Sequence, residues 1–303
     1  MKHLIIYHNA DFDGLCSMSI IRQWCLQNEE TADVIGYNYG KDTPTFNPED
    51  YNLVWVVDVC LDTKTMLSLK EASKIVWIDH HATSIQDSVD NGYNDAFGIR
   101  REGKGACELC WEMIHLYDHK EVPLFVQWLS AYDVWDKKRF DWENVTLPFQ
   151  YGMRNRFNLN AEEFFTFFTR FTDKTNEIDK ILRSGQTIIR YIRNTGKTAC
   201  NNYAFEITIG DKIKGLAMMT AHFGALEFEQ SMHERGCQVA VCINKRTDSE
   251  DYNISVYAAD SDMKDFNIGE YMKTNYRGGG HRSAASGKLT QQEFLRLLTE
   301  KKI

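Results

Sequence analysis

Three short apolar runs, each typical of a buried β-strand, end at side chains that bind metals or transfer protons. The runs cover residues 3–7, 53–57 and 74–78, and they lead respectively into His8 with Asp11 and Asp13, into Asp58, and into Asp79-His80-His81. In an open parallel sheet, ligands bind beyond the carboxyl ends of the strands. The sequence therefore predicts a cluster of carboxylates and imidazoles at one edge of a parallel sheet.

Such a cluster requires positive charge close by, because carboxylates a few Å apart repel one another and one of them would otherwise take up a proton. Divalent cations meet this requirement, and mixed aspartate and histidine ligands suit Mn²⁺, Mg²⁺ or a related first-row ion such as cobalt. Asp11 and Asp13 stand at alternate positions, so one loop can reach two ions, and Gly14 permits a tight backbone there. A two-metal hydrolase is the natural interpretation.

The remaining pattern predicts an α/β protein with two domains. Strands are expected at residues 3–7, 53–58 and 74–79, helices at 14–27 and 62–72, and mostly helical structure from about 105 to 190. Residues 205–209 and 214–219 flank Gly210-Asp211 as in a hairpin, two more strands are expected at 238–243 and 253–258, and Thr290 with Glu293 forms a capping box before a last helix. A parallel-sheet domain followed by a smaller α+β domain results.

A change in composition supports a boundary near residue 190. All seven tryptophans and all four prolines precede residue 149, while isoleucine and leucine recur at helical spacing between 178 and 192. Gly196 is interpreted as the stop of that helix. The predicted parts are residues 1–175, a connecting helix at 176–197, and residues 198–303.

Five motifs together resemble the DHH phosphoesterase superfamily. They are His8-x-x-Asp11-x-Asp13-Gly14, Val57-Asp58, Asp79-His80-His81, Tyr132-Asp133, and Gly278-Gly279-Gly280-His281 followed by Ala284-Ala285-x-Gly287. The fifth is similar to the glycine-rich motif of the C-terminal domain that accompanies DHH domains. The five occur in the family's order and span almost the whole chain.

The resemblance implies a specific set of ligands and supporting residues. One metal would be held by His8, Asp11 and Asp58, and the other by Asp13, Asp58, His80 and Asp133, with Asp58 bridging the two. His81 would face the substrate phosphate, and Asp79 would orient the histidines. Asp133 is preferred to Asp136 from the family pattern alone.

The resemblance also assigns substrate binding to the C-terminal domain and places the active site in the cleft between domains. His281, the glycines Gly278, Gly279 and Gly280, and the flanking Arg277 and Arg282 would grip the substrate. One departure concerns Tyr257, which stands where many relatives carry an arginine in a Ser-x-Arg strand. We therefore expect the contact with the substrate phosphate, and the substrate itself, to differ from those of relatives that carry the arginine.

Composition narrows the substrate class. The net charge is −8, and no basic stripe of the kind that binds long nucleic acids is evident. Among the activities that the resemblance to DHH phosphoesterases implies, the first expectation is a nanoRNase-type phosphodiesterase that converts short oligonucleotides or linear dinucleotides to 5′-mononucleotides, with manganese as the preferred ion. Alternatives are a phosphatase acting on phosphoadenosine phosphate or pyrophosphate, and an inactive nucleotide-binding regulator.

Several further expectations concern the environment of the chain. The eight cysteines are scattered, which indicates buried thiols, and Cys107 and Cys110 are expected on a helix without redox or zinc chemistry. No apolar run approaches the roughly 18 to 20 residues that cross a bilayer, and the N-terminus lacks the apolar core of a signal peptide. A cytoplasmic protein without a membrane partner is expected, with a homodimer left open.

Overall fold

The computed structural model describes residues 1–170, 175–210, 212–220, 223–245, 247, 249–259, 263 and 266–303. Contacts within it divide the chain into two compact units, Met1–Gln186 (unit 1) and Thr187–Ile303 (unit 2). Each unit has its own sheet and its own hydrophobic core. The predicted α/β architecture, with a parallel N-terminal sheet and a smaller α+β unit after it, is confirmed.

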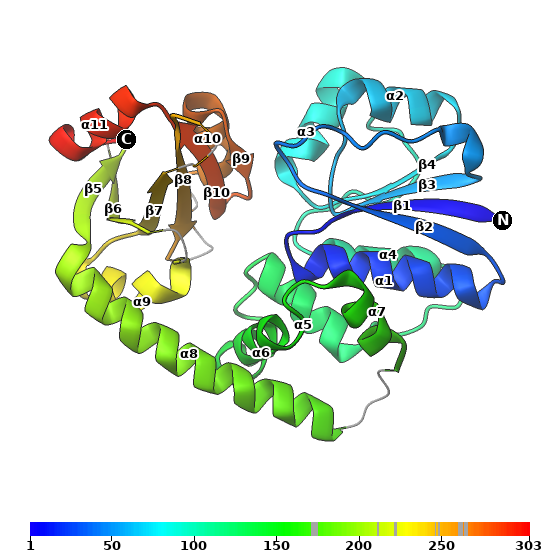
Figure 1. Cartoon of the computed structure of the whole chain (residues 1–303), viewed down its shortest axis with the longest axis horizontal. Helices are drawn as coiled ribbons and strands as arrows, with labels where there is room; N and C mark the ends of the chain where they lie inside the picture. The colour runs from blue at the N-terminus through cyan, green and yellow to red at the C-terminus, as the bar shows by residue number, and fades with distance from the viewer. Residues whose placement is uncertain are drawn as a thin grey trace. The chain divides into compact units, whose positions relative to one another are not determined.

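Unit 1 contains a four-stranded parallel sheet (Figure 1). Its strands are β1 (Lys2–His8), β2 (Thr31–Tyr37), β3 (Leu53–Val57) and β4 (Ile75–Ile78), in the order β2-β1-β3-β4. The three runs predicted from the sequence are thus confirmed as neighbouring strands, while the edge strand β2 was not predicted. Their carboxyl ends share one edge of the sheet because all pairings are parallel.

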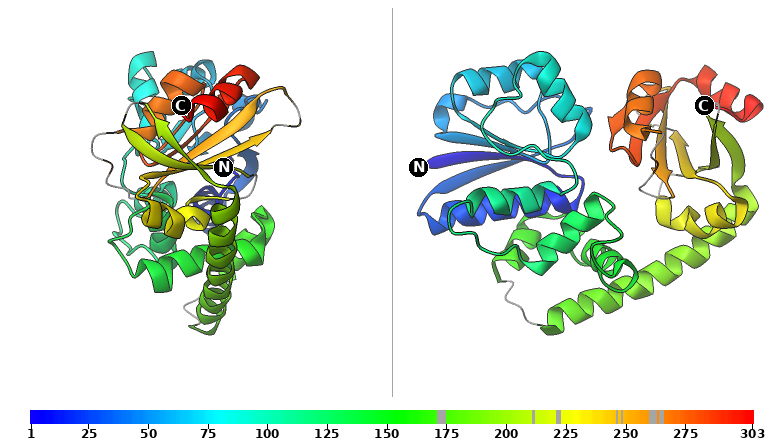
Figure 2. Two further views of the ribbon diagram at one scale, coloured as in Figure 1. Left: turned by 90° about the vertical axis from the view of Figure 1, so that its left-hand side faces the viewer. Right: turned by 180° about the vertical axis from the view of Figure 1, so that it is seen from behind.

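Helices cover both faces of this sheet. Helices α1 (Phe12–Gln27) and α4 (Ala106–Ile114) lie on one face, and α2 (Thr63–Glu71) and α3 (Ala82–Asn91) lie on the other (Figures 1 and 2). Ile5 and Tyr7 join the core that includes α1 and α4, whereas Leu4 and Ile6 join the core on the opposite face. Burial on both faces explains why the strands are continuous apolar runs and not alternating ones.

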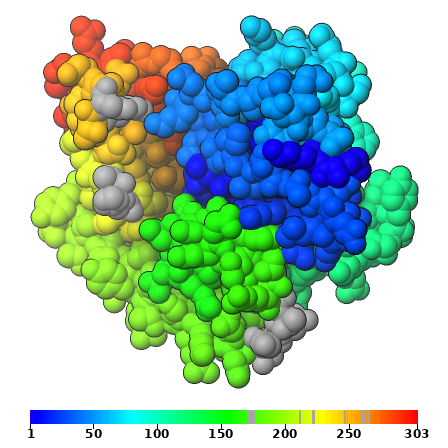
Figure 3. Space-filling model, turned by 45° about the vertical axis from the view of Figure 1, so that its right-hand side comes forward, coloured from blue at the N-terminus to red at the C-terminus, as the bar shows by residue number. Residues whose placement is uncertain are grey.

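Additional helices extend unit 1 beyond α1. They are α5 (Leu124–Asp133), α6 (Leu147–Phe157) and α7 (Ala161–Arg170), with short helical turns at Pro48–Asp50 and Trp142–Thr146. Phe12 of α1 packs against Phe164 of α7, with ring centroids 5.6 Å apart. In the space-filling view the blue N-terminal segment and the green helices of unit 1 pack side by side (Figure 3).

Unit 2 is built on a six-stranded mixed sheet, preceded by the long helix α8 (Thr175–Tyr203), within which the boundary between the units falls. The strands are β5 (Phe205–Ile209), β6 (Ile213–Met219), β7 (Val239–Lys245), β8 (Tyr252–Ala258), β9 (Gly279–Gly280) and β10 (Ala284–Leu289), in the order β5-β6-β7-β8-β10-β9. Among the strand pairs described in this six-stranded sheet, only β6 and β7 run parallel.

The helices of unit 2 are α9 (Ala225–Arg235), α10 (Ile268–Tyr276) and α11 (Gln291–Glu300). The predicted pairing of residues 205–209 with 214–219 is confirmed, although Asp211 lies outside the described residues. The capping box of Thr290 and Glu293 at the start of α11 is also confirmed.

Gly196 does not end a helix, so that prediction was wrong. Helix α8 continues through it to Tyr203. A β-carbon at this position would lie 2.5 Å from the carbonyl oxygen of Glu227 in α9. The glycine therefore permits the close approach of two helices, a role that a sequence pattern does not distinguish from a helix stop.

The cysteines are buried thiols, as expected. All eight are buried, and Cys107 and Cys110 lie within α4. Burial raises the pKa of both thiols well above the usual value. Across the residues that the structure describes, no helix has the length and apolar character needed to span a membrane.

Candidate metal centre

The first part of the centre lies at the junction between the end of β1 and the start of α1. His8 is the last residue of β1, and Asp11 is the N-cap of α1, with one carboxylate oxygen accepting a hydrogen bond from the backbone N–H of Gly14 at 3.0 Å. The other oxygen of Asp11 lies 3.1 Å from Nδ1 of His8. An N-cap aspartate is the residue that a helix start favours, so the local fold itself directs Asp11 to His8.

Asp58 follows β3 immediately and joins the two halves of the centre. Its carboxylate is 1% exposed, and its backbone has a φ of 59°, which is costly for a residue with a β-carbon. The backbone N–H of Asp58 donates to the carbonyl of Ile78 in β4 at 2.9 Å and so fixes this conformation. One carboxylate oxygen faces Nδ1 of His8 at 3.6 Å, and the other faces Nε2 of His80 at 3.1 Å.

Asp13 is held by the N-terminus of α4. Its two carboxylate oxygens accept hydrogen bonds from the backbone N–H groups of Ala106 and Cys107, at 2.6 and 2.9 Å. This approach needs a glycine at position 105, since a β-carbon there would lie 2.8 Å from Oδ1 of Asp13. The positive end of the helix dipole then stabilises a carboxylate that is only 2% exposed.

Three carboxylates of the centre lie close to Nε2 of His80. Its Nε2 lies 3.5 Å from Asp13, 3.1 Å from Asp58 and 3.2 Å from Asp133. Asp133 is the last residue of α5, whereas the carboxylate of Asp136 accepts from the nearby backbone N–H of Lys138. The structure thus brings Asp133, and not Asp136, to His80.

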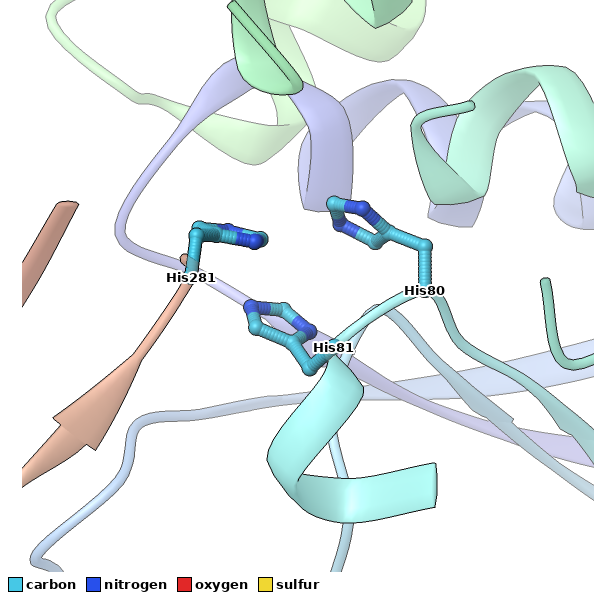
Figure 4. Close-up of side chains that lie close together, drawn as sticks. All are labelled: His80, His81 and His281. Atoms are coloured by element: carbon cyan, nitrogen blue, oxygen red, sulfur yellow. The ribbon is translucent and has the colours of Figure 1, made fainter. Parts of the chain in front are cut away.

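Asp79 anchors the turn that carries both histidines. Its Oδ1 accepts from the backbone N–H groups of His80 and His81, at 2.7 and 3.1 Å, and lies 2.7 Å from Nδ1 of His81. The backbone of Asp79 makes two hydrogen bonds: its N–H donates to the carbonyl of Ile99, and its carbonyl accepts from the N–H of Arg101. Because an ionised Asp79 can only accept, His81 donates through Nδ1, and Nε2 is the nitrogen that points to other partners. Figure 4 shows the two rings, whose centroids are 4.6 Å apart.

The electrostatics of these side chains reflect an excess of negative charge. Burial, and then the charge of Asp58, raise the pKa of Asp13 to about 7, and burial together with Asp13 raises the pKa of Asp133. Burial would also raise the pKa of Asp58, but the nearby imidazoles of His8 and His80 hold it below the usual range. The pKa values of both imidazoles are also raised: burial alone would lower them, but the carboxylates raise the pKa of His8 to about 11 and that of His80 well above its usual value.

The donor set fits divalent metal ions. His8, Asp11 and Asp58 form one group, and Asp13, His80 and Asp133 form another, with the candidate ligand atoms of each group within 4.8 Å of one another. Among the described residues, Nδ1 of His8 and Oδ2 of Asp58 and Asp133 are buried without a hydrogen-bond partner. Unsatisfied buried donors and acceptors are costly. Nitrogen and carboxylate donors without thiolates suit manganese or magnesium.

The predicted substrate-binding residues of unit 2 lie around β9. Gly279 and Gly280 form β9, which pairs with Ala285 and Ser286 of β10, and the backbone N–H of His281 donates to the carbonyl of Ala284 at 2.7 Å. Arg277 caps α10 and its guanidinium contacts Glu293 and the carbonyl of Lys288, while Arg282 donates to the carbonyl of Met263. His281, drawn in Figure 4, follows β9 directly.

Sequence reasoning missed residues that support the centre from a distance. Ser130 accepts from the backbone N–H of Gly105 and donates to the buried Glu108, which Arg139 contacts through both terminal nitrogens. Tyr39 contacts the rings of His8 and His81. None of these residues belongs to a motif. The one available signal was Glu108 itself, a charged residue among the apolar positions of a helix.

Comparison with known structures identifies the fold. The DHH domain of a protein described as a member of a family of ribosomal proteins matches over 99% of this chain and 86% of its own, with a TM-score of 0.61 and 14% identity. The chain has the fold of a DHH protein. A pGpG-specific phosphodiesterase, PggH of Vibrio cholerae, matches over 99% of this chain and 97% of its own, with a TM-score of 0.52 and 15% identity.

A third structure of the DHH fold, RecJ of Thermus thermophilus in complex with Mn²⁺, gives a TM-score of 0.55 at 12% identity; the match covers 98% of this chain and 51% of that one. No family model matches the sequence, and no curated protein is significantly similar to it. The resemblance deduced from the five motifs is therefore confirmed at the level of the fold.

Proposed function

We propose that this protein is a metal-dependent phosphodiesterase that hydrolyses linear dinucleotides or short oligonucleotides to 5′-mononucleotides. The observation that carries the proposal is the position of Asp58 between two ligand groups: one of its oxygens faces His8 of the first group, and the other faces His80 of the second. Two ions joined by one carboxylate are the arrangement that phosphoryl-transfer hydrolases use. His8, Asp11 and Asp58 would hold one ion, and Asp13, Asp58, His80 and Asp133 the other.

When bound, such ions supply Lewis acidity toward phosphoryl oxygens and make water a stronger nucleophile at neutral pH. The protein's own contribution is orientation and proton handling. Asp79 fixes the imidazole of His81 through Nδ1, and Nε2 of His81 is the nitrogen proposed to hydrogen-bond a phosphoryl or leaving oxygen. Burial of Asp13, Asp58 and His80 keeps water away from the ligand atoms and so strengthens each of these interactions.

The substrate class is supported by charge and by fold. A chain of net charge −8 gains little from phosphates that lie outside its active site, which favours short substrates. The fold is shared with a phosphodiesterase specific for pGpG, a name that denotes two linked guanosine nucleotides, and with a RecJ that was solved with Mn²⁺. Manganese is the ion we propose first, with magnesium or cobalt as alternatives.

His281, with the glycines before it and with Arg277 and Arg282, is proposed to bind the substrate from unit 2. Glycines without side chains let a phosphate approach the backbone closely, and the imidazole and guanidinium groups add positive charge. The residue at the position of the usual arginine, Tyr257, is a half-buried tyrosine in β8. Its uncharged side chain supplies no charge toward a phosphate.

The test is a substrate panel with the purified protein in Mn²⁺ or Mg²⁺. The panel contains a linear dinucleotide, longer RNA, phosphoadenosine phosphate and pyrophosphate, and products are separated by ion-exchange chromatography. We expect mononucleotides from the dinucleotide, and no turnover after chelation. Release of orthophosphate from phosphoadenosine phosphate, with AMP as the other product, or from pyrophosphate, without cleavage of the dinucleotide, would favour the phosphatase alternative. Binding without any turnover would favour a regulator.

A further inference from the structure

Tyr39 lies beside the metal centre and is fixed there by its hydroxyl. It stands two residues after β2, and its hydroxyl accepts from the backbone N–H of Cys60 at 3.1 Å and shares a hydrogen bond of 3.2 Å with Ser84. Cys60 comes two residues after Asp58, and Ser84 comes three residues after His81. One hydroxyl thus connects the segments that carry two residues of the centre.

The ring of Tyr39 lies against two histidines of the centre. Its centroid is 5.8 Å from that of His8 and 5.9 Å from that of His81, with interplanar angles of 62° and 70°. These are edge-to-face contacts, which place a tyrosine ring next to the imidazole proposed to face the phosphate.

Tyr39 is partly exposed although its hydroxyl is engaged. The residue is 47% exposed, while its hydroxyl is held by the hydrogen bonds with Cys60 and Ser84. An aromatic surface that two hydrogen bonds already hold in place loses little conformational freedom when a planar ligand covers it.

We propose that Tyr39 is a stacking surface for the base of the nucleotide whose phosphate lies at His81. The inference rests on the proposed function, and it narrows the substrate to phosphate esters that carry a base. Stacking on an aromatic side chain tolerates any base and typically contributes about tenfold or more to affinity. The residue thereby distinguishes nucleotides from sugar phosphates and from inorganic phosphates.

The experiment compares two ligands that differ only in the base. Binding of AMP and of ribose 5-phosphate to the full chain in Mn²⁺ is measured by titration calorimetry, for the wild type, Tyr39→Ala and Tyr39→Phe. The control is Tyr117→Ala, because Tyr117 is 93% exposed and lies in no part of the centre. We expect the wild type to prefer AMP by about tenfold or more, Tyr39→Ala to lose that preference, and Tyr39→Phe and the control to retain it.

Two results would overturn the inference. In one, the wild type binds AMP and ribose 5-phosphate with equal affinity. In the other, Tyr39→Ala lowers the affinity for both ligands by the same factor, which would mean that the ring only supports the histidines. Metal-dependent hydrolysis of a dinucleotide is measured on the same wild-type preparation. A protein that prefers AMP without hydrolysing anything would refute the proposed function and leave the stacking site intact.

Discussion

Replacement of Glu108 by glutamine tests whether the helix that holds Asp13 also sets the affinity for metal. Glu108 is 1% exposed. Its carboxylate accepts two hydrogen bonds from Arg139 and one from Ser130, and it forms an ion pair with Lys104, with all four distances between 2.6 and 2.9 Å. Ser130 in turn accepts from Gly105, the N-cap of the helix whose first N–H groups bind Asp13. A glutamine fills the same volume but turns one acceptor into a donor.

The magnitude follows from the burial of the partners. Breaking a fully buried ion pair costs about 3–5 kcal/mol. The side chains of Arg139 and Lys104 are 26% and 35% exposed, so hydration by water offsets part of the interaction that they lose with the Glu108 carboxylate. We therefore expect Glu108→Gln to lower the free energy of unfolding by about 2 kcal/mol. Loss of residues that orient metal ligands typically weakens metal binding by about 10- to 100-fold, and we expect about tenfold for one of two ions.

The pH dependence gives a second check on the same variant. Although burial opposes ionisation, contacts with Arg139, Lys104 and Ser130 lower the pKa of Glu108 from its usual 4.5. A carboxylate with a lowered pKa stabilises the fold above its unfolded pKa, and this contribution disappears as the pH falls through the folded value. The stability difference between wild type and variant should be constant from about pH 6 to 8 and should shrink below about pH 4.5.

The assay combines denaturant unfolding with Mn²⁺ titration, and Glu112→Gln is the matched control. Glu112 lies one turn further along α4 and contacts Lys104 and Arg101 at the surface, so its loss should cost less than about 1 kcal/mol and leave metal binding unchanged. If Glu108→Gln is destabilised but binds two ions with wild-type affinity, then α4 does not control the position of Asp13, or Asp13 is not a ligand.

Three further predictions concern the proposed centre. Asp58→Ala should retain the fold but lose turnover and the second ion, because Asp58 faces both ligand groups; a titration that shows two ions and near-normal turnover would refute the bridge. His281→Ala should impair turnover or substrate binding with metal content near that of the wild type, and a fall in metal stoichiometry would instead make His281 a ligand. Cleavage should decline as linear RNA grows from two to about ten nucleotides, since each added phosphate meets a surface of the same sign; equal rates on a dinucleotide and a long strand would contradict this.

The parts of the fold that the sequence predicted are those with a strong local signal. Strands β1, β3 and β4 are buried on both faces and read as apolar runs, so their ends, and with them the motif residues, could be located. Strand β2 lies at the edge, contains Asp33 and Gly36, and is buried fully only at Tyr37, so it has no comparable run. Helix α3 buries only Ser84 and Ser88, which leaves it without apolar periodicity.

The residues that support the centre escaped prediction for a different reason. Tyr39 and Glu108 act through contacts with residues 21 to 45 positions away in the sequence, and such contacts depend on packing and not on spacing. Gly196 illustrates the same limit, because the pattern indicated a helix stop where the structure requires close helix packing. Motif residues are recognisable because their chemistry is unusual, whereas ordinary residues gain a role only from their neighbours.

The protein can assemble this concentration of acidic groups because the fold supplies compensation before any ion binds. Asp11 and Asp13 lie at the N-terminus of α1, and Asp13 also receives two N–H groups from α4. Each helix N-terminus contributes roughly half a positive charge, and N–H groups fix a carboxylate's direction as well as its charge. Asp58, by contrast, receives its compensation from His8 and His80, which are themselves proposed ligands. The helices therefore orient the carboxylates permanently, while the contacts of Asp58 with the histidines are the ones that metal binding would replace.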